Sequence, residues 1–401
     1  MSATGALKGL RVLDLTGLKG ALASRLLADM GADVIKVEPP GGDRTRSLGP
    51  FAGNQPHPDR SLSFWFYNLN KRSVTLDYQH ARGAGLLLRL VESADVMIES
   101  FKPDHLAQFG LEWDELRKRN PALILCSIAP FGQTGPWRDF EADDTVLAAL
   151  SGMLYVNGFP DEPPVRPLGL QAYHCAAYYG AIAIMCALFA RERTGRGQWI
   201  DLSMQEAAAW GVEHVAPSYF GTGQIARRRG TLHWAGGFRV GKCRDGYILH
   251  SISGDWSTLL EWVKADGAAQ DLTQPQWEDP QYRRDHAAHL FDVLDAWVRD
   301  KSCVELEQRA QMLRLPYAIP HSINDLPRDE QLVARNYFVE VEHPELGRKF
   351  LYPGAPYIFS HTPWRLYRRP PLLGEHNDAV LGGELGISHE EIAVLRAEGV
   401  C

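Results

Sequence analysis

The sequence predicts an α/β protein of more than one domain, in which helices alternate with the strands of a parallel sheet. The chain has 401 residues, which is more than one compact core usually holds. In its first half, short apolar runs alternate with segments of helical periodicity, as in a parallel sheet with crossover helices. After Trp210 the pattern becomes irregular and then helical and polar, which indicates a second, smaller domain.

The N-terminal elements follow each other at a regular pitch. Leu10–Leu15 is a short run of branched apolar residues, as expected of a buried parallel strand. Gly20–Met30 places its apolar residues at helical spacing, and Asp33–Val37 is a second strand. The alternation continues with helices at Gly83–Ser93, Leu106–Asn120 and Ala172–Arg193 and with strands at Asp95–Ile98, Leu123–Ile128 and Ile200–Met204. The connections between such strands are right-handed.

The second half is predicted with less regular structure. Tyr219–Gly241 is rich in glycine, arginine and aromatic residues, has no clear period and is expected to be a loop. The remaining elements are a strand at Gly246–Ser253, helices from Trp256 to Leu326, a hairpin at Tyr337–Glu342 and Lys349–Leu351, extended chain at Tyr352–Pro371 and a helix at His389–Ala397. We expect a large domain from residues 1–205, a small domain from 206–335, and a return to the large domain at 336–401.

Composition excludes several classes of function. A net charge of −7 and a pI of about 6.1 do not fit a general nucleic-acid binder. The six cysteines form no CxxC pair and no zinc-like spacing, so we expect reduced thiols and no metal. The apolar run Ala176–Ala190 is too short to span a bilayer, and Met1–Lys8 lacks the apolar core of a signal peptide. These features predict a cytoplasmic protein without a membrane partner.

Loops at the carboxyl ends of the predicted strands are the expected ligand site, because ligands of parallel sheets bind there. These loops carry the basic residues Lys19, Arg44, Arg46, Lys71, Arg72 and Lys102. A single basic residue in a loop is usually solvated. Several of them at one edge of a sheet favour an anion site.

An ordered set of motifs resembles the class III CoA-transferase family, which also contains the α-methylacyl-CoA racemases. The resemblance runs from Leu7 to the C-terminus. It rests on LKGLRVLDLT, on LLADMGADVIKVEPPGGDRTR (26–46), on NLNKRSVTLD (68–77), on ADVMIESFKPDHLAQFGL (94–111), on FGQTGP (131–136), on LSGM (150–153), on RERTGRGQWIDLSMQEA (191–207) and on PLLGEHNDAVL (371–381). It implies a Rossmann-like large domain, a small domain, and two subunits interlocked like linked rings.

The resemblance also implies coenzyme A or an acyl-CoA as substrate, bound at the strand-end loops. Position by position, it places Asn70, Lys71 and Arg72 near the nucleotide. Ser100, Phe101 and Lys102 occupy the corresponding places in the next loop. Lysine and arginine suit the phosphates, and an aromatic ring suits the adenine, although core packing is an equally good reason for Phe101.

The family's nucleophilic aspartate is absent. In the family it lies 21 residues before the threonine of TGRGQ, which places it at Tyr173, and no Asp or Glu occurs between Pro164 and Arg191. A phenol of pKa ~10 is a poor substitute for a carboxylate that must form and break an anhydride. His174 and Cys175 stand beside it, but adjacent helical residues do not face each other.

Other positions also depart from the family pattern. Asp143 stands where the racemases of the family carry a histidine that acts as a base. Asp144 matches an acidic position that supports the active site of the transferases. Ser100 replaces an asparagine. Gln108 and Glu141 stand where relatives carry basic residues, which removes contacts with phosphate or adds repulsion.

Three functional hypotheses remain. The first is a CoA-transferase subunit whose nucleophilic aspartate comes from a homologous partner in a heterodimer or heterotetramer, as in succinyl-CoA:benzylsuccinate CoA-transferases. Its substrates would be an acyl-CoA such as succinyl-CoA and a carboxylic acid, and the aromatic loops favour an aromatic acid. The second is a homodimeric acyl-CoA isomerase or hydrolase with altered chemistry. The third is a non-catalytic acyl-CoA-binding protein.

Overall fold

The computed structural model describes residues 5–233 and 236–401, and its chain divides into two compact units. The larger unit contains Met1–Met153, Pro167–Ala216 and Ala334–Cys401. The smaller unit contains Leu154–Arg166 and Pro217–Val333. The larger unit therefore combines the beginning, the middle and the end of the chain.

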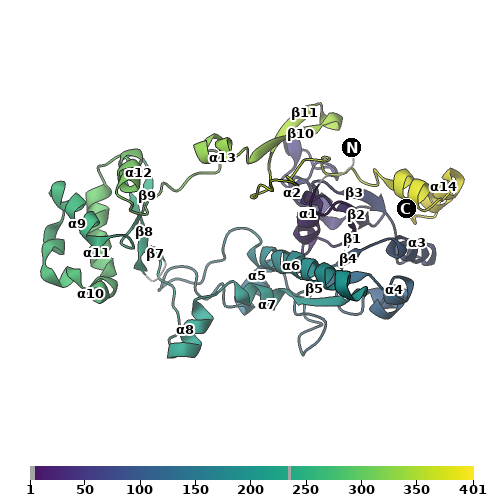
Figure 1. Ribbon diagram of the computed structural model, residues 1–401, viewed down its shortest axis with the longest axis horizontal. Coiled ribbons are helices and arrows are strands. Elements are labelled where there is room, and N and C mark those ends of the chain that lie inside the picture. The colour runs from purple at the N-terminus through teal and green to yellow at the C-terminus, as the bar shows by residue number, and fades with distance from the viewer. Residues whose placement is uncertain (1–4, 234–235) are drawn as a thin grey trace. The chain divides into compact units, whose positions relative to one another are not determined.

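The larger unit is built around a six-stranded parallel sheet with the order β3-β2-β1-β4-β5-β6 (Figure 1). Its strands are β1 (Arg11–Leu15), β2 (Asp33–Glu38), β3 (Arg72–Thr75), β4 (Val96–Glu99), β5 (Ile124–Ala129) and β6 (Trp199–Ser203). Most residues of the central strands are buried, as their apolar sequence predicts. The strand order reverses direction beside β1, so β1 and β4 border the crevice where such sheets bind ligands.

Helices cover both faces of this sheet, and each face has its own apolar core. The helices of the larger unit are α1 (Ala21–Asp29), α2 (Leu62–Asn68), α3 (Ala81–Glu92), α4 (Trp113–Arg119), α5 (Asp144–Leu150), α6 (Gln171–Thr194), α7 (Met204–Trp210) and α14 (His389–Ala397). Residues of α1, α5, α6 and α7 share the core of one face, and residues of α3, α4 and α14 share the core of the other. The predicted α/β class with a parallel sheet is confirmed.

The TGRGQ motif has a packing role at the end of α6. Gly195 adopts a left-handed conformation with φ of 66° and ends the helix. Two residues later the chain passes against Leu123, so that a Cβ atom on Gly197 would lie 1.7 Å from the Leu123 carbonyl oxygen. Only glycine fits there, which ties α6 to the start of β5.

The C-terminal segment is fixed to the edge strand β3. The Asn377 side chain accepts a hydrogen bond from the Thr75 backbone N–H (2.8 Å) and donates one to the Thr75 hydroxyl (2.7 Å). His376 Nδ1 accepts from the Ser73 N–H, and the Gly374 N–H donates to the Ser73 hydroxyl. The GEHN motif thus satisfies backbone groups that an edge strand leaves open.

The smaller unit combines an antiparallel sheet with helices around a third core. Its sheet has the order β7-β8-β9, formed by Leu232–His233, Phe238–Lys242 and Tyr247–Ser251. Its main helices are α9 (Trp256–Ala265), α10 (Pro280–Asp285), α11 (Ala287–Val298) and α12 (Cys303–Met312). The helix α8 (Val215–Thr222) leads into this unit, and α13 (Glu330–Ala334) leads out to the hairpin β10–β11 (Phe338–His343 and Arg348–Pro353).

Three expected elements differ from the structure. The predicted helix Leu106–Asn120 is split into a 3-10 turn at Leu106–Phe109 and α4, because Gly110 adopts φ of 69° between them. The segment Tyr219–Gly241 contains parts of α8 and β8 and all of β7, not only loop. The strand β3 lies inside a motif that is expected, from sequence, to be a strand-end loop.

Candidate functional site

A buried ionic cluster lies at the carboxyl end of β1. The Lys71 ammonium is fully buried and donates to Asp14 Oδ2 (2.8 Å), the Ser24 hydroxyl (2.8 Å) and Asn68 Oδ1 (2.9 Å). Burial alone would raise the pKa of Asp14, but the nearby Lys71 and Lys36 ammonium groups lower it well below its usual range. Lys71 therefore lies at the centre of a buried network that joins β1, α1 and α2.

The two neighbours of Lys71 are also occupied within the protein. Asn70 adopts a left-handed backbone with φ of 65°, and its amide bridges Asp29 (2.9 Å) and the Tyr367 N–H (2.8 Å). The Arg72 guanidinium pairs with Asp33 and with Glu384. These contacts join the loop before β3 to the C-terminal segment.

The loop after β4 contains the second predicted group. The Ser100 hydroxyl accepts from the Gly17 N–H at 3.1 Å and so connects this loop to the loop after β1. The Phe101 ring lies 4.6 Å from the His105 ring and 5.6 Å from the Tyr78 ring, measured between centroids. Phe101 therefore packs against the sheet core while remaining partly exposed.

Charged side chains meet at the surface of this loop. Lys102 is 66% exposed and forms an ion pair with Glu141, whose carboxylate is 71% exposed. The hydrogen bond from Lys102 lowers the pKa of Glu141. Burial lowers the pKa of Lys19, against the opposing effect of Glu141. The structure thus places Lys19, Lys102 and Glu141 close enough to interact, on the segments that follow β1, β4 and β5 respectively.

Tyr173, at the expected nucleophile position, is the third residue of α6 and is only 6% exposed. Its backbone N–H donates to Asp144 Oδ1 at 3.1 Å, at the unpaired N-terminal end of the helix. Burial, with the carboxylates of Asp143 and Asp144, raises the pKa of Tyr173 to about 12. The phenol is therefore protonated at neutral pH and is a weak nucleophile.

His174 and Cys175 differ in their surroundings. His174 Nε2 lies 2.9 Å from the hydroxyl of Tyr67, at the end of α2, and burial lowers the pKa of His174. Burial also raises the pKa of the Cys175 thiol, so this thiol is not activated. The lowered pKa favours the neutral form of His174, and the hydrogen bond with the Tyr67 hydroxyl fixes the position of its imidazole.

Asp143 and Asp144 begin α5. Asp143 caps the helix, since its Oδ1 accepts from the Val146 N–H at 2.9 Å. Asp144 is 3% exposed and joins the start of α5 to the start of α6 through Tyr173. The structure therefore brings Asp143, Asp144, Tyr173 and His174 together, and places Phe101 and Lys102 in the loop after β4.

A cavity of about 290 Å³ lies beside the ends of β4 and β5. Glu99, Ser127 and Gln133 contribute polar groups, and Trp113 and Trp199 contribute rings. Burial raises the pKa of Glu99 to about 7, against the lowering effect of hydrogen bonds from Ser127 and the Phe101 N–H. Lys102 also lines this cavity.

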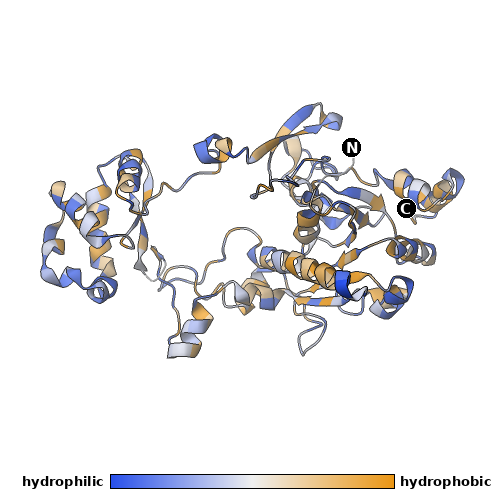
Figure 2. Ribbon diagram, in the orientation of Figure 1, coloured by the Kyte–Doolittle hydropathy of each residue, from blue (hydrophilic) through white to orange (hydrophobic). Residues whose placement is uncertain are grey.

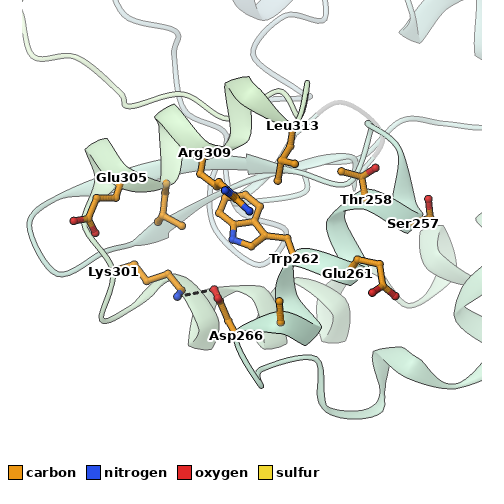
Figure 3. A pocket seen from close by; sticks show the side chains of 11 residues that line it. Ser257, Thr258, Glu261, Trp262, Asp266, Lys301, Glu305, Arg309 and Leu313 are labelled. Carbon is orange, nitrogen blue, oxygen red and sulfur yellow. Dashed lines mark ion pairs between the residues drawn. The ribbon is translucent and has the colours of Figure 1, made fainter.

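A larger hollow, of about 610 Å³, lies on the smaller unit between α9 and α12 (Figure 3). Trp262 forms its floor, and Lys301 pairs with Asp266 at 2.7 Å along one side. None of the residues predicted for the site lines it. Within residues 5–233 and 236–401, no three His, Cys, Asp or Glu side chains gather as a metal site requires.

Sequence reasoning missed Tyr67 and Glu99 as members of the site. The partner of Tyr67 is 107 residues away in the sequence. The burial of Glu99 depends on residues of β5 and β6. The signal that could have found Glu99 is a carboxylate at the end of a fully apolar strand.

Comparison with known proteins identifies relatives over the whole chain. The sequence pattern of CoA-transferase family III matches residues 7–377. A succinyl-CoA:(R)-benzylsuccinate CoA-transferase subunit, BbsE, from Thauera aromatica is 35% identical over 380 residues, covering 92% of each chain. A succinyl-CoA–D-citramalate CoA-transferase from Chloroflexus aurantiacus is 32% identical over 407 residues, covering 98% of each chain.

The fold also matches a solved structure. A CAIB/BAIF family protein from Brucella suis superimposes with a TM-score of 0.85 at 29% sequence identity. The match covers 94% of this chain and 99% of that one. The fold is therefore shared at the level of the whole chain.

Proposed function

This chain belongs to CoA-transferase family III, and we propose that it is the subunit of a CoA-transferase that lacks the nucleophile, with a homologous partner subunit supplying the aspartate. The observation that carries the proposal is Tyr173, a buried phenol with a pKa of about 12 where the family's carboxylate would stand. The assembly we propose is a heterodimer or heterotetramer of interlocked subunits in the cytoplasm.

The chemistry requires the partner's carboxylate at every step. It attacks the thioester carbonyl of the acyl-CoA donor, the C–S bond breaks, and CoA leaves as a thiolate while a mixed anhydride forms. The thiolate then attacks the aspartyl carbonyl, releasing the donor acid and giving an enzyme–CoA thioester. The acceptor carboxylate then attacks this thioester, so that CoA leaves as a thiolate and an anhydride of the acceptor acid and the aspartate forms. The thiolate finally attacks the acceptor's acyl carbon in this anhydride, which gives the acceptor's CoA thioester and frees the aspartate carboxylate.

In this proposal the chain contributes binding surface and positioning. Phe101 and Lys102 face the nucleotide of CoA, with Lys19 adding charge. Asn70, Lys71 and Arg72 act indirectly, since their polar groups fix the loop before β3 and the first residue of that strand. We propose succinyl-CoA as donor and a carboxylic acid with an aromatic group as acceptor, on the pattern of the benzylsuccinate relative.

The test is to isolate the chain from its native cells without denaturation and to weigh the intact complex. A second chain of similar size with an aspartate at the position of Tyr173 supports the proposal, provided that only the complex transfers CoA from succinyl-CoA. A complex that contains this chain alone and transfers CoA would refute it.

A second candidate function is a self-sufficient acyl-CoA hydrolase or isomerase, which the Tyr67–His174 hydrogen bond favours. A neutral imidazole can accept a proton from water or from an acyl α-carbon. Turnover of acyl-CoA by the chain alone, lost in both H174A and Y67F, would support this candidate. Unchanged turnover in both variants would exclude it.

A further inference from the structure

Lys19 is a half-buried lysine in the loop after β1. Among residues 5–233 and 236–401, no group accepts a hydrogen bond from its ammonium or pairs with it in a salt bridge. Other lysines of the larger unit differ in this respect. Lys36 and Lys71 are held by carboxylates inside the protein, and Lys102 and Lys118 pair with glutamates at the surface. The amine of Lys19 is therefore free to react with a ligand.

Three charged groups from other segments of the chain face Lys19. They are Lys102 after β4, Glu141 after β5, and Asp143 at the start of α5. Burial and then the Lys102 ammonium lower the pKa of Lys19, whereas Glu141 and Asp143 oppose this effect. At neutral pH a larger fraction of Lys19 is therefore an uncharged amine than in an exposed lysine. The uncharged amine is the form that acts as a nucleophile.

Lys19 also lies close to the position of the family's nucleophile. Besides burial, the Asp143 carboxylate affects the pKa of both Lys19 and Tyr173, so it is near both side chains. Leu18, the neighbour of Lys19 in the chain, packs against the same apolar core as Tyr173. The Lys19 amine is thus placed among the loop after β4, the start of α5 and the start of α6. We expect the thioester of a bound acyl-CoA in this region.

The helix α6 makes one side of this region apolar. It packs against α1, which begins directly after the Lys19 loop. No Asp, Glu, Lys or Arg occurs between Arg166 and Arg191, and Figure 2 shows α6 coloured as hydrophobic until its last turn. The helix is long and apolar enough to cross a membrane, yet half of its most apolar 18 residues is buried in the protein. Apolar surroundings favour the uncharged form of a lysine.

We propose that Lys19 is a site of covalent acylation by the acyl-CoA that this chain binds. The uncharged amine attacks the thioester carbonyl, the C–S bond breaks, and an amide bond forms between the acyl group and Nζ. The ammonium loses two protons in all, of which one leaves with CoA as its thiol and the other passes to water. Because a carboxylate does not displace an amide, the acyl group is not passed on to an acceptor acid. The product is a modified chain and not an intermediate of CoA transfer.

The modification changes the charge of the candidate site. With succinyl-CoA, the ammonium of Lys19 is replaced by an amide that carries a carboxylate, so a positive charge becomes a negative one. The phosphates of CoA are anionic, and the acylated chain should therefore bind CoA more weakly than the unmodified chain. Accumulated acyl-CoA would in this way switch off its own binding. The inference rests on the proposed function only in taking acyl-CoA as the ligand of these loops.

The experiment incubates the full purified chain, and its native complex, with succinyl-CoA and measures succinyl attachment by intact mass and peptide mapping. Lys19 should gain the succinyl group at least about tenfold faster than Lys118, an exposed lysine paired with Glu115. Excess free CoA should slow the modification of Lys19 but not that of Lys118. K19R should lose the fast modification, and the matched control K118R should keep it. Circular dichroism confirms that both variants are folded.

A thioester without the nucleotide separates binding from the reactivity of the amine. S-succinyl-N-acetylcysteamine should lose most of the preference for Lys19, and an undiminished preference would overturn acylation by bound acyl-CoA. Calorimetry with CoA distinguishes the remaining outcomes. If CoA binds but Lys19 reacts no faster than Lys118, the inference is wrong and the proposed function stands. If CoA binds neither the chain nor its native complex, both are wrong. Unchanged CoA affinity after succinylation of Lys19 would refute the switch.

Discussion

Replacing Lys71 by methionine removes the ammonium from the centre of the larger unit while keeping the length of the side chain. The substitution breaks the ion pair with Asp14 and three further hydrogen bonds, all of them buried. Of the two ammonium groups that lower the pKa of Asp14, Lys36 then remains. Losing one partner of a buried ion pair costs about 3–5 kcal/mol.

Urea unfolding followed by circular dichroism measures this loss. With an m-value of ~3 kcal/mol/M, the K71M midpoint should fall by about 1–1.7 M. K102M is the matched control, because Lys102 is 66% exposed and its pairing with Glu141 should change stability by less than about 0.5 kcal/mol. The D14N/K71M double variant should be more stable than the sum of the single effects predicts.

CoA binding, measured by calorimetry, distinguishes the structural role of Lys71 from contact with the nucleotide. If Lys71 is structural, folded K71M binds CoA like wild type, whereas K102M binds it more weakly. A K71M variant with wild-type stability and a binding defect as large as that of K102M would refute the reasoning.

Three further predictions concern the motifs. G197A should lose at least about 3 kcal/mol of unfolding free energy in urea titrations, because its Cβ would overlap the Leu123 carbonyl. G195A should lose only about 1–2 kcal/mol, which is the cost of a left-handed backbone at a residue with a Cβ atom. Equal losses in the two variants would contradict this. Burial raises the folded-state pKa of Glu99 to about 7, so its protonation adds to the free energy of unfolding fully below pH 4.5, and this contribution is lost as the pH rises through 7. E99Q should therefore remove about 3 kcal/mol of the change in unfolding free energy between these pH values. Parallel curves of unfolding free energy against pH for wild type and E99Q would argue against this. Y173D should allow this chain to form a covalent CoA adduct with succinyl-CoA, visible by intact mass, and an unmodified chain would show that the surrounding site is incomplete.

The sheet could be predicted from the sequence because its signal is local. Leu10–Leu15 and Leu123–Ile128 are apolar runs that lie almost wholly within β1 and β5, and the fold class followed from their alternation with helices. The break at Gly110 was missed because a single residue with positive φ interrupts an otherwise continuous apolar period. The strand β3 was missed because Arg72 and Ser73 are polar, and their burial depends on Asp33, Glu384 and the C-terminal segment.

The positions of the candidate residues could be proposed from the sequence, but their contacts could not. Tyr173 could be located by counting from Thr194, and the structure places it at the start of α6 beside Asp144. The partners of Lys71 could not be predicted, because Ser24 and Asp14 approach it only when the first helix packs on the sheet. A basic residue in a strand-end loop can face a ligand or the core, and local sequence does not distinguish the two.

The attachment of the GEHN segment to β3 has a consequence for the order of events during synthesis. A ribosome releases β1, β2 and β3 early, but the groups that satisfy Ser73 and Thr75 belong to His376 and Asn377, about 300 residues later. Until translation ends, the nascent chain carries an open sheet edge, which is exposed to mispairing and available to chaperones. A frameshift or stop codon near residue 370 would therefore leave the first domain unfinished, although every strand of its sheet had already been made.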